Sequence, residues 1–203
     1  MKRFVVTLFL SAVSFLAAAA QPAQQLVQET SERMLATLKA EREAIQKNPD
    51  RLYELVREIV LPHFDFEQMS RLVLGKNWRK ATPEQRERFV QEFQILLVRT
   101  YGTALNEYRD EKIVYLPLRQ QPDAKEVTVR TEVQRTGAPP IPIDYSMVLE
   151  DGQWKVYDVT IEGVSLVLNY RTSFASEIRQ GGFDLLLKKL IERNQKPVTQ
   201  SPA

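Results

Sequence analysis

Cysteine is absent from this 203-residue sequence, and histidine occurs once, at His63. Without cysteine the chain can form neither a disulfide nor a thiolate site, and a single histidine cannot complete a typical zinc site or a catalytic triad. The sequence also has no glycine-rich phosphate loop, no HExxH motif and no G-x-S-x-G turn. The common signatures of metal, nucleotide and hydrolase sites are therefore missing, and the function has to be sought in other features.

Long hydrophobic runs are also absent, except at the N-terminus. Lys2 and Arg3 precede an apolar run that ends in small residues at Ala20. This order is typical of a secretory signal peptide, and the run is shorter than the roughly 20 residues that a membrane span needs. We predict a cleaved signal peptide at residues 1–20, a single domain at 21–195 and a disordered tail at 196–203.

An excess of basic charge is missing once this leader is removed. The full chain has 28 Lys and Arg against 26 Asp and Glu, so the loss of Lys2 and Arg3 leaves 26 of each. A protein that binds nucleic acid needs a basic surface that survives processing. We therefore expect no nucleic-acid partner.

Helical periodicity dominates the first half of the mature chain. Apolar residues recur at helical spacing from Gln24 to about Trp78, with breaks at 48–50 and at Pro62. Asp65, three residues before Gln68, is typical of a helix N-cap. These signals predict three helices before residue 80.

A longer helix is predicted to follow. Thr82 can cap it, Pro83 suits its first position, and Gln85 completes a capping box. If it continues to Arg109, its length is about 40 Å.

The apolar pattern then changes to a period of two residues. Four such segments, 113–118, 127–133, 141–149 and 154–157, predict about four antiparallel strands, with a hairpin turn at 151–152. Two short helices should close the domain. We expect an α+β fold with helices packed on a curved antiparallel sheet. Because a long helix can pack closely on a curved sheet along only part of its length, we also expect an apolar cavity between them.

The segment VYDVTIEGVSLVLNYRTSF, residues 156–174, has more apolar side chains than a strand followed by a helix needs for its own packing. It also carries Asp158, which could act as a base if burial raises its pKa. Asp158 could instead bind neighbouring backbone groups or pair with an arginine such as Arg171. Both readings remain open from the sequence.

Two stretches resemble the MlaC family, the toluene-tolerance periplasmic proteins. They are LVLGKNWRKATPEQRERFVQEFQILLVRTYGTAL (72–105) and WKVYDVTIEGVSLVLNYRTSF (154–174), and the resemblance extends over about 26–191. It implies a periplasmic phospholipid carrier that maintains the asymmetry of the outer membrane, is not an enzyme and needs no cofactor. Its implied partners are an outer-membrane lipoprotein–porin complex and an inner-membrane ABC transporter. We expect it to act as a monomer.

On this basis we predict the walls of a cavity for acyl chains. The strand-to-helix junction, the long helix and the sheet should each contribute apolar or aromatic side chains. The predicted lipid-binding residues are Val159, Ile161, Val164, Leu166 and Val167 at the junction, Tyr101, Leu105 and Tyr108 on the long helix, and Val129, Ile143, Tyr145 and Met147 on the sheet.

Two other functions remain open at this level. The same scaffold could be a small periplasmic enzyme that uses Asp158 with a tyrosine, or an interaction module that presents the long helix to a partner. A polar cleft would favour the enzyme, and a solid core without a void would favour the interaction module.

Overall fold

The computed structural model describes residues 22–106, 111–118 and 123–196. The predicted signal peptide and residues 197–203 of the predicted tail lie outside this part of the chain. Within it, no helix is both long enough and apolar enough to cross a membrane.

The N-terminal half is helical, as its periodicity predicts. Helix α1 (Ala23–Ala40) and α2 (Arg42–Lys47) are followed by α3 (Asp50–Ile59) and a 3-10 turn, η1 (Leu61–His63). Pro49 is the residue before α3, and Pro62 lies in η1, so both predicted breaks coincide with helix boundaries.

The predicted N-caps of the next helices are confirmed. The Asp65 carboxylate accepts a hydrogen bond from the Gln68 amide at 2.8 Å and starts α4 (Phe66–Leu74), which α5 (Lys76–Lys80) follows. Thr82 and Gln85 exchange side-chain-to-backbone hydrogen bonds at 3.0 and 3.2 Å before α6 (Pro83–Asn106). The 24 residues of α6 span about 36 Å at 1.5 Å per residue.

The second half forms one antiparallel meander in the order β1-β2-β3-β4-β5. It has one strand more than the predicted four, because residues 164–165 add a two-residue edge strand after the turn at Gly163. A register shift between Ser146 and Met147 interrupts the pairing of the third and fourth strands. The strands are β1 (Lys112–Tyr115), β2 (Glu126–Arg135), β3 (Ala138–Glu150), β4 (Gln153–Ile161) and β5 (Val164–Ser165).

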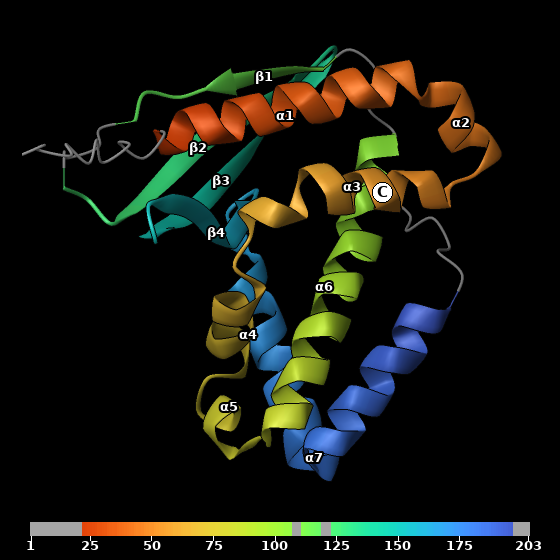
Figure 1. The fold of residues 1–203 in the computed structure, drawn as a ribbon, viewed down its shortest axis with the longest axis vertical. Helices are drawn as coiled ribbons and strands as arrows, with labels where there is room; N and C mark the ends of the chain where they lie inside the picture. The colour runs from red at the N-terminus through yellow and green to blue at the C-terminus, as the bar shows by residue number, and fades with distance from the viewer. Residues whose placement is uncertain (1–21, 107–110, 119–122, 197–203) are drawn as a thin grey trace, which may run out of the picture.

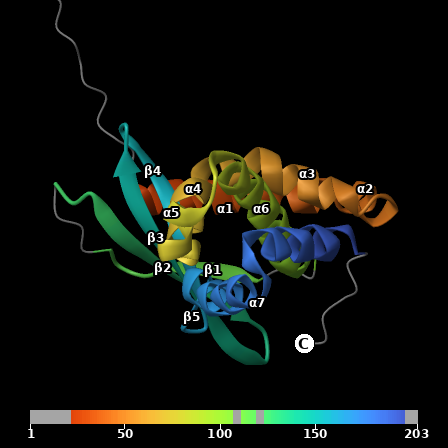
Figure 2. The same ribbon diagram turned by 90° about the horizontal axis from the view of Figure 1, so that it is seen from below.

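The chain closes with α7 (Leu166–Gln195), which contains two helical arms. Gly181 and Gly182 have non-helical backbone angles, and Gly182 has φ 78°, a left-handed value that glycine tolerates best. The chain turns back there, so the two arms correspond to the two predicted closing helices. Figure 1 shows α1 lying across the sheet, while α4, α6 and the two arms of α7 extend away from it as a bundle. Figure 2 shows the same arrangement from below.

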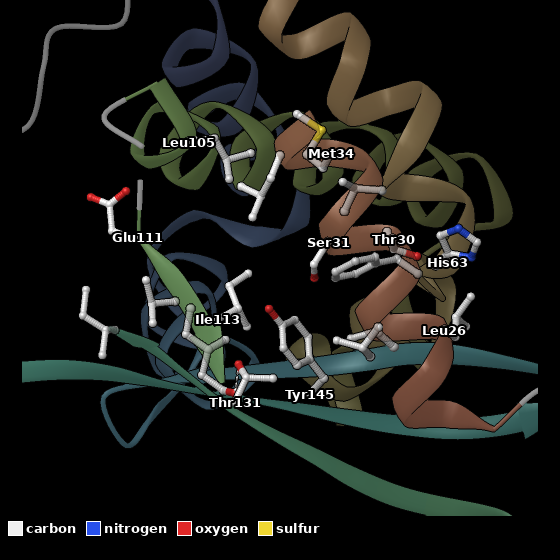
Figure 3. Close-up of a pocket in the computed structure, with 18 of the residues that line it drawn as sticks. Leu26, Thr30, Ser31, Met34, His63, Leu105, Glu111, Ile113, Thr131 and Tyr145 are labelled. Atoms are coloured by element: carbon white, nitrogen blue, oxygen red, sulfur yellow. Dashed lines mark hydrogen bonds between the residues drawn. The ribbon is translucent and has the colours of Figure 1, made fainter. Parts of the chain in front are cut away.

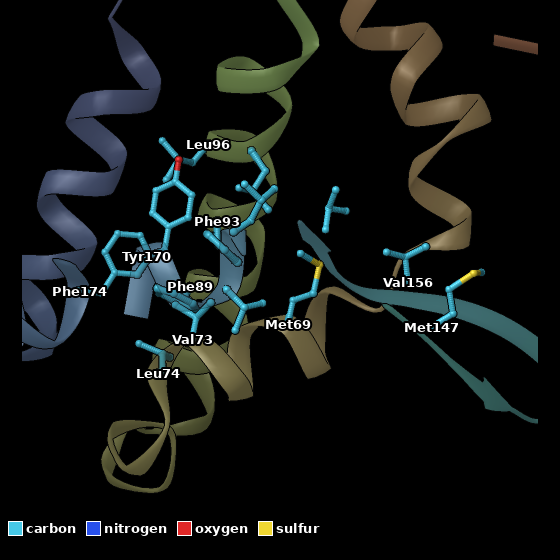
Figure 4. Close-up of a cluster of buried hydrophobic side chains, with 14 of the residues drawn as sticks. Met69, Val73, Leu74, Phe89, Phe93, Leu96, Met147, Val156, Tyr170 and Phe174 are labelled. Carbon is cyan, nitrogen blue, oxygen red and sulfur yellow. The ribbon is translucent and has the colours of Figure 1, made fainter. Parts of the chain in front are cut away.

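The buried side chains form two separate clusters. The larger, the bundle core, joins α4, α6 and α7 to the sheet and has an aromatic centre of Phe89, Phe93, Tyr170 and Phe174 (Figure 4). The smaller, the α1–α3 core, joins α1, α2 and α3, with Met34 and Leu55 among its members. The two cores are not continuous with each other, and this separation positions the site described next.

Candidate binding pocket

A pocket of about 380 Å³ lies between α1 and the inner face of the sheet (Figure 3). Its lining comes from α1, from the segment around η1, from the end of α6 and from four strands. The lining residues are Leu26, Val27, Thr30, Ser31, Met34, Leu35, Val60, His63, Phe64, Leu105, Glu111, Ile113, Thr131, Val133, Arg135, Ile141, Ile143, Tyr145, Met147 and Val156.

The pocket exists because α1 belongs to both cores but fills the space between them incompletely. Val27 is buried in the bundle core, and Met34 is buried in the α1–α3 core. These residues lie two helical turns apart on one face of α1. Between them the same face carries Thr30 and Ser31, whose short side chains border the pocket. The gap in packing therefore follows from small residues in the middle of an otherwise apolar helical stripe.

Most of the lining is aliphatic or aromatic, so the pocket suits an apolar ligand. The two charged lining residues among those described, Glu111 and Arg135, lie where β1 begins and β2 ends. The described part of the chain contains no cluster of histidine and acidic residues that could hold a metal ion.

Burial in the pocket wall favours the neutral forms of His63 and Tyr145. Burial lowers the pKa of His63 below its usual 6.5, and Lys155 and Arg33 lower it further. The Tyr145 ring is half-buried by area because one side borders the pocket, but removal of its hydroxyl from water raises its pKa to about 12. At neutral pH Tyr145 is therefore a neutral hydroxyl and His63 is predominantly neutral.

Four of the predicted lipid-binding residues line this pocket. Ile143, Tyr145 and Met147 face it from alternate positions of β3, and Leu105 reaches it from the last turn of α6. The period-two pattern of β3 therefore places these three side chains on the face that borders the pocket.

The other predicted residues within the described ranges lie outside the pocket. Leu166 and Val167 are buried in the bundle core, while Val164 sits at a turn with 54% of its surface exposed. At the junction, Leu166 and Val167 thus pack the start of α7, Val164 and Leu168 are exposed, and none of the predicted junction residues lines this pocket. Tyr108 lies outside the described residues. The remaining four, Tyr101, Val129, Val159 and Ile161, belong to the bundle core or pack against it.

The main helical wall is α1, which the sequence reasoning did not place there. The long helix α6 packs instead against α7, α4 and α3, and among its described side chains only Leu105 near its end reaches the pocket. A usable signal was present in the sequence. The buried stripe of α1 runs through Ala23, Val27, Met34 and Leu38 and is interrupted by Thr30 and Ser31.

Asp158 has a structural role in this fold. One carboxylate oxygen accepts a 2.5 Å hydrogen bond from the Ser165 hydroxyl, and the other accepts from the Val167 amide at 3.1 Å. The Ser165 hydroxyl in turn accepts from the Leu168 amide at 3.1 Å and caps α7. Asp158 therefore anchors the start of α7, as its backbone-binding alternative predicted.

Comparison with known proteins gives a consistent result. A family model described as MlaC protein matches residues 28–192. The toluene tolerance protein ttg2D of Pseudomonas putida is 33% identical over 177 residues, which cover 87% of this chain and 82% of that protein. The intermembrane phospholipid transport system binding protein MlaC of Haemophilus influenzae is 28% identical over 198 residues, covering 96% of this chain and 92% of that protein.

A solved structure is similar over most of its length. The phospholipid-binding protein from Ralstonia solanacearum, determined in complex with a phospholipid, superimposes with a TM-score of 0.80 at 34% sequence identity. The match covers 86% of this chain and 97% of that one. At this level of identity and coverage the two chains share a fold over the matched residues.

Proposed function

Because this chain belongs to the MlaC family, we propose that it is a phospholipid carrier that encloses acyl chains in the pocket under α1 and moves lipid between membranes. Support comes from the related R. solanacearum protein, which binds a phospholipid, and from the H. influenzae relative, which is a binding protein of an intermembrane phospholipid transport system. The observation that carries the proposal is the apolar pocket in the gap between the two cores.

An apolar pocket would lower the free-energy cost of moving a lipid through water. A diacyl lipid has on the order of 30 methylenes, and exposing them costs roughly 24 kcal/mol at about 0.8 kcal/mol each. A carrier has to cover this surface during transit. It does not have to bind with that whole energy, because the competing state is a bilayer in which the chains are equally dry.

The volume of the pocket sets a condition on this proposal. At about 380 Å³ it lies near the lower end of the roughly 300–1,000 Å³ range of ligand sites. A site for two full acyl chains is expected nearer the upper end of this range, so we propose that loading moves the α1 layer and the sheet apart. The two cores on either side of the pocket can each remain packed during such a movement, because they are already separate.

The proposed location is the periplasm. The chain would be exported there if residues 1–20 act as a secretion signal. We propose an outer-membrane lipoprotein–porin complex and an inner-membrane ABC transporter as the two docking partners, with the carrier acting as a monomer. Membership of the MlaC family supports the proposed location and the two proposed partners, because the H. influenzae relative is a binding protein of an intermembrane phospholipid transport system.

A test compares lipid content in two matched variants. Ile143→Glu places a carboxylate in the pocket wall, whereas Ile95→Glu makes the same change at a site on α6 that is 42% exposed and outside the pocket. Each protein is purified, extracted with organic solvent and analysed by mass spectrometry. We expect about one phospholipid per chain in the wild type and in Ile95→Glu, and none in Ile143→Glu with unchanged circular dichroism. Absence of lipid from the wild type, or its retention by Ile143→Glu, would contradict the proposal.

A further inference from the structure

Several hydroxyl side chains lie close together in one part of the mostly apolar pocket wall. Ser31 of α1, Thr131 of β2 and Tyr145 of β3 line the pocket there, and Tyr115 of β1, which is not itself a lining residue, pairs with Thr131. We call these four side chains the hydroxyl band. In β2 and β3 the band residue interrupts an apolar pattern, since Thr131 lies between Val129 and Val133, and Tyr145 between Ile143 and Met147.

Strand register explains why these residues meet. Tyr115 pairs with Thr131 across β1 and β2, and Thr131 pairs with Ile143 across β2 and β3. Tyr145 is two residues beyond Ile143, so it lies diagonal to Thr131 on the same face of the sheet. Figure 3 shows the Tyr145 hydroxyl pointing from the sheet into the pocket, and the Ser31 hydroxyl pointing into the same space from α1.

The side chains of the hydroxyl band interact with one another, but they can still donate a hydrogen bond to a ligand. The Thr131 hydroxyl donates to the Ile143 carbonyl at 2.9 Å and contacts the Tyr145 hydroxyl, while Ser31 bonds to Tyr115. A hydroxyl has one hydrogen and two lone pairs, so the bond between Ser31 and Tyr115 uses one of their two hydrogens. The second hydrogen remains for another acceptor. Because Thr131 has already donated its hydrogen to Ile143, the Tyr145 hydroxyl is the donor in its contact with Thr131, and it can redirect this hydrogen to a stronger acceptor on a ligand. Burial raises the pKa of Tyr145 to about 12, so the hydroxyl keeps this hydrogen at physiological pH.

Hydroxyls in an apolar pocket cost free energy unless a partner satisfies them. Phenylalanine, alanine and valine would fill the same positions without that cost. The band therefore indicates that the ligand brings oxygen atoms to this level of the pocket. Apolar lining continues on both sides, toward Leu26 and Phe64 in one direction and toward Ile113 and Ile141 in the other.

We propose that the hydroxyl band binds the ester carbonyl oxygens at the junction between the glycerol and the acyl chains of a diacyl phospholipid. The inference rests on the proposed function and extends it from tail burial to recognition of the ester linkage. An ester carbonyl is a strong acceptor, and it is the polar group that lies closest to the tails. A dialkyl ether lipid of the same shape lacks this carbonyl.

The experiment is a competition between two lipids that differ only at this linkage. Delipidated protein is incubated with vesicles that contain equal amounts of diacyl and dialkyl phosphatidylglycerol of identical chain length, and the bound lipids are counted by mass spectrometry. One hydrogen bond corresponds to a preference of about 2- to 10-fold. We expect the wild type to take up the diacyl lipid with this preference.

Three variants locate the source of the preference. Tyr145→Phe and Ser31→Ala each remove a band hydroxyl and should bring the diacyl-to-dialkyl ratio toward one while lipid remains bound. Tyr157→Phe removes the same atom from a tyrosine of β4 that does not line the pocket, and should keep the wild-type ratio. Thermal unfolding of each delipidated variant establishes that it is folded.

The possible failures are distinguishable. If the wild type binds both lipids equally, or if Tyr145→Phe and Ser31→Ala keep the preference, the band does not read the ester and the inference is overturned while the carrier function stands. If the folded wild type takes up neither lipid, the inference and the proposed function both fail.

Discussion

Filling the pocket with a side chain of the protein should stabilise the fold and remove the lipid. Val133 on β2 is suited to this test because it borders the pocket and is half-buried. Its cross-strand neighbours Ile113 and Ile141 also line the pocket. We therefore consider the substitution Val133→Phe, which extends an apolar side chain into the empty space.

The magnitude follows from the carbons added. Phenylalanine has four more side-chain carbons than valine, and at about 0.8 kcal/mol per buried group complete burial would contribute roughly 3 kcal/mol. Because the pocket is partly open, we expect about 1–2 kcal/mol of added stability in delipidated protein, or an increase in Tm of roughly 2–8 °C. The ring occupies the space of about four acyl methylenes, so the affinity for lipid should decrease about 100-fold.

Val129→Phe is the matched control. Val129 lies four residues away on the same face of the same strand, but it is 0% exposed and belongs to the bundle core. Overpacking at such a site typically destabilises a protein by about 1–3 kcal/mol. Calorimetry of both delipidated variants, combined with lipid extraction, gives the readout. If Val133→Phe is destabilised as much as Val129→Phe and still binds lipid, the pocket is not an available apolar space and the reasoning is wrong.

Three further predictions concern the junction and the histidine. Val164→Glu should change the free energy of unfolding by less than about 0.5 kcal/mol and leave the lipid content unchanged, because Val164 is exposed at a turn. Loss of lipid from this variant would instead indicate that the junction forms part of the cavity wall. Asp158→Ala should lower the free energy of unfolding by about 1–3 kcal/mol in urea titrations, because Ser165 and the α7 N-terminus lose their acceptor; wild-type stability would show that the anchor is dispensable. The pKa of His63 is lower in the folded protein than its usual 6.5, so the unfolded chain takes up this proton first as the pH falls. The contribution of His63 to the free energy of unfolding should therefore be complete above pH 6.5 and should decrease below it until His63 is also protonated in the folded protein. His63→Gln should abolish this part of the pH dependence, and an unchanged pH profile of urea unfolding would exclude His63 as its source.

The local signals in the sequence were reliable because they act between near neighbours. The caps at Asp65 and Thr82 each require only a side chain and a backbone amide three residues away, and both form as predicted. The alternation in β3 also placed Ile143, Tyr145 and Met147 on one face. The match to the MlaC family confirms the resemblance that the two quoted stretches carried.

The placement of the pocket could not be obtained in this way. The apolar residues at 164–168 have the same composition whether they line a cavity or pack a helix start, and contacts with distant segments decide between these outcomes. Leu166 and Val167 join the bundle core, whereas Val164 faces solvent. Similarly, the length of α6 suggested that its apolar face packs on the sheet, but in the structure α6 packs mainly against α7, α3 and α4.

The amino-acid order alone therefore determined the helices, the meander, their caps and the family, because short-range hydrogen bonds and side-chain periodicity are properties of contiguous residues. Tertiary structure decided which apolar residues meet and where they fail to meet. The pocket arises because α1 contributes to two cores that stay apart around Thr30 and Ser31, and a space left between packed segments is a property of their arrangement in three dimensions.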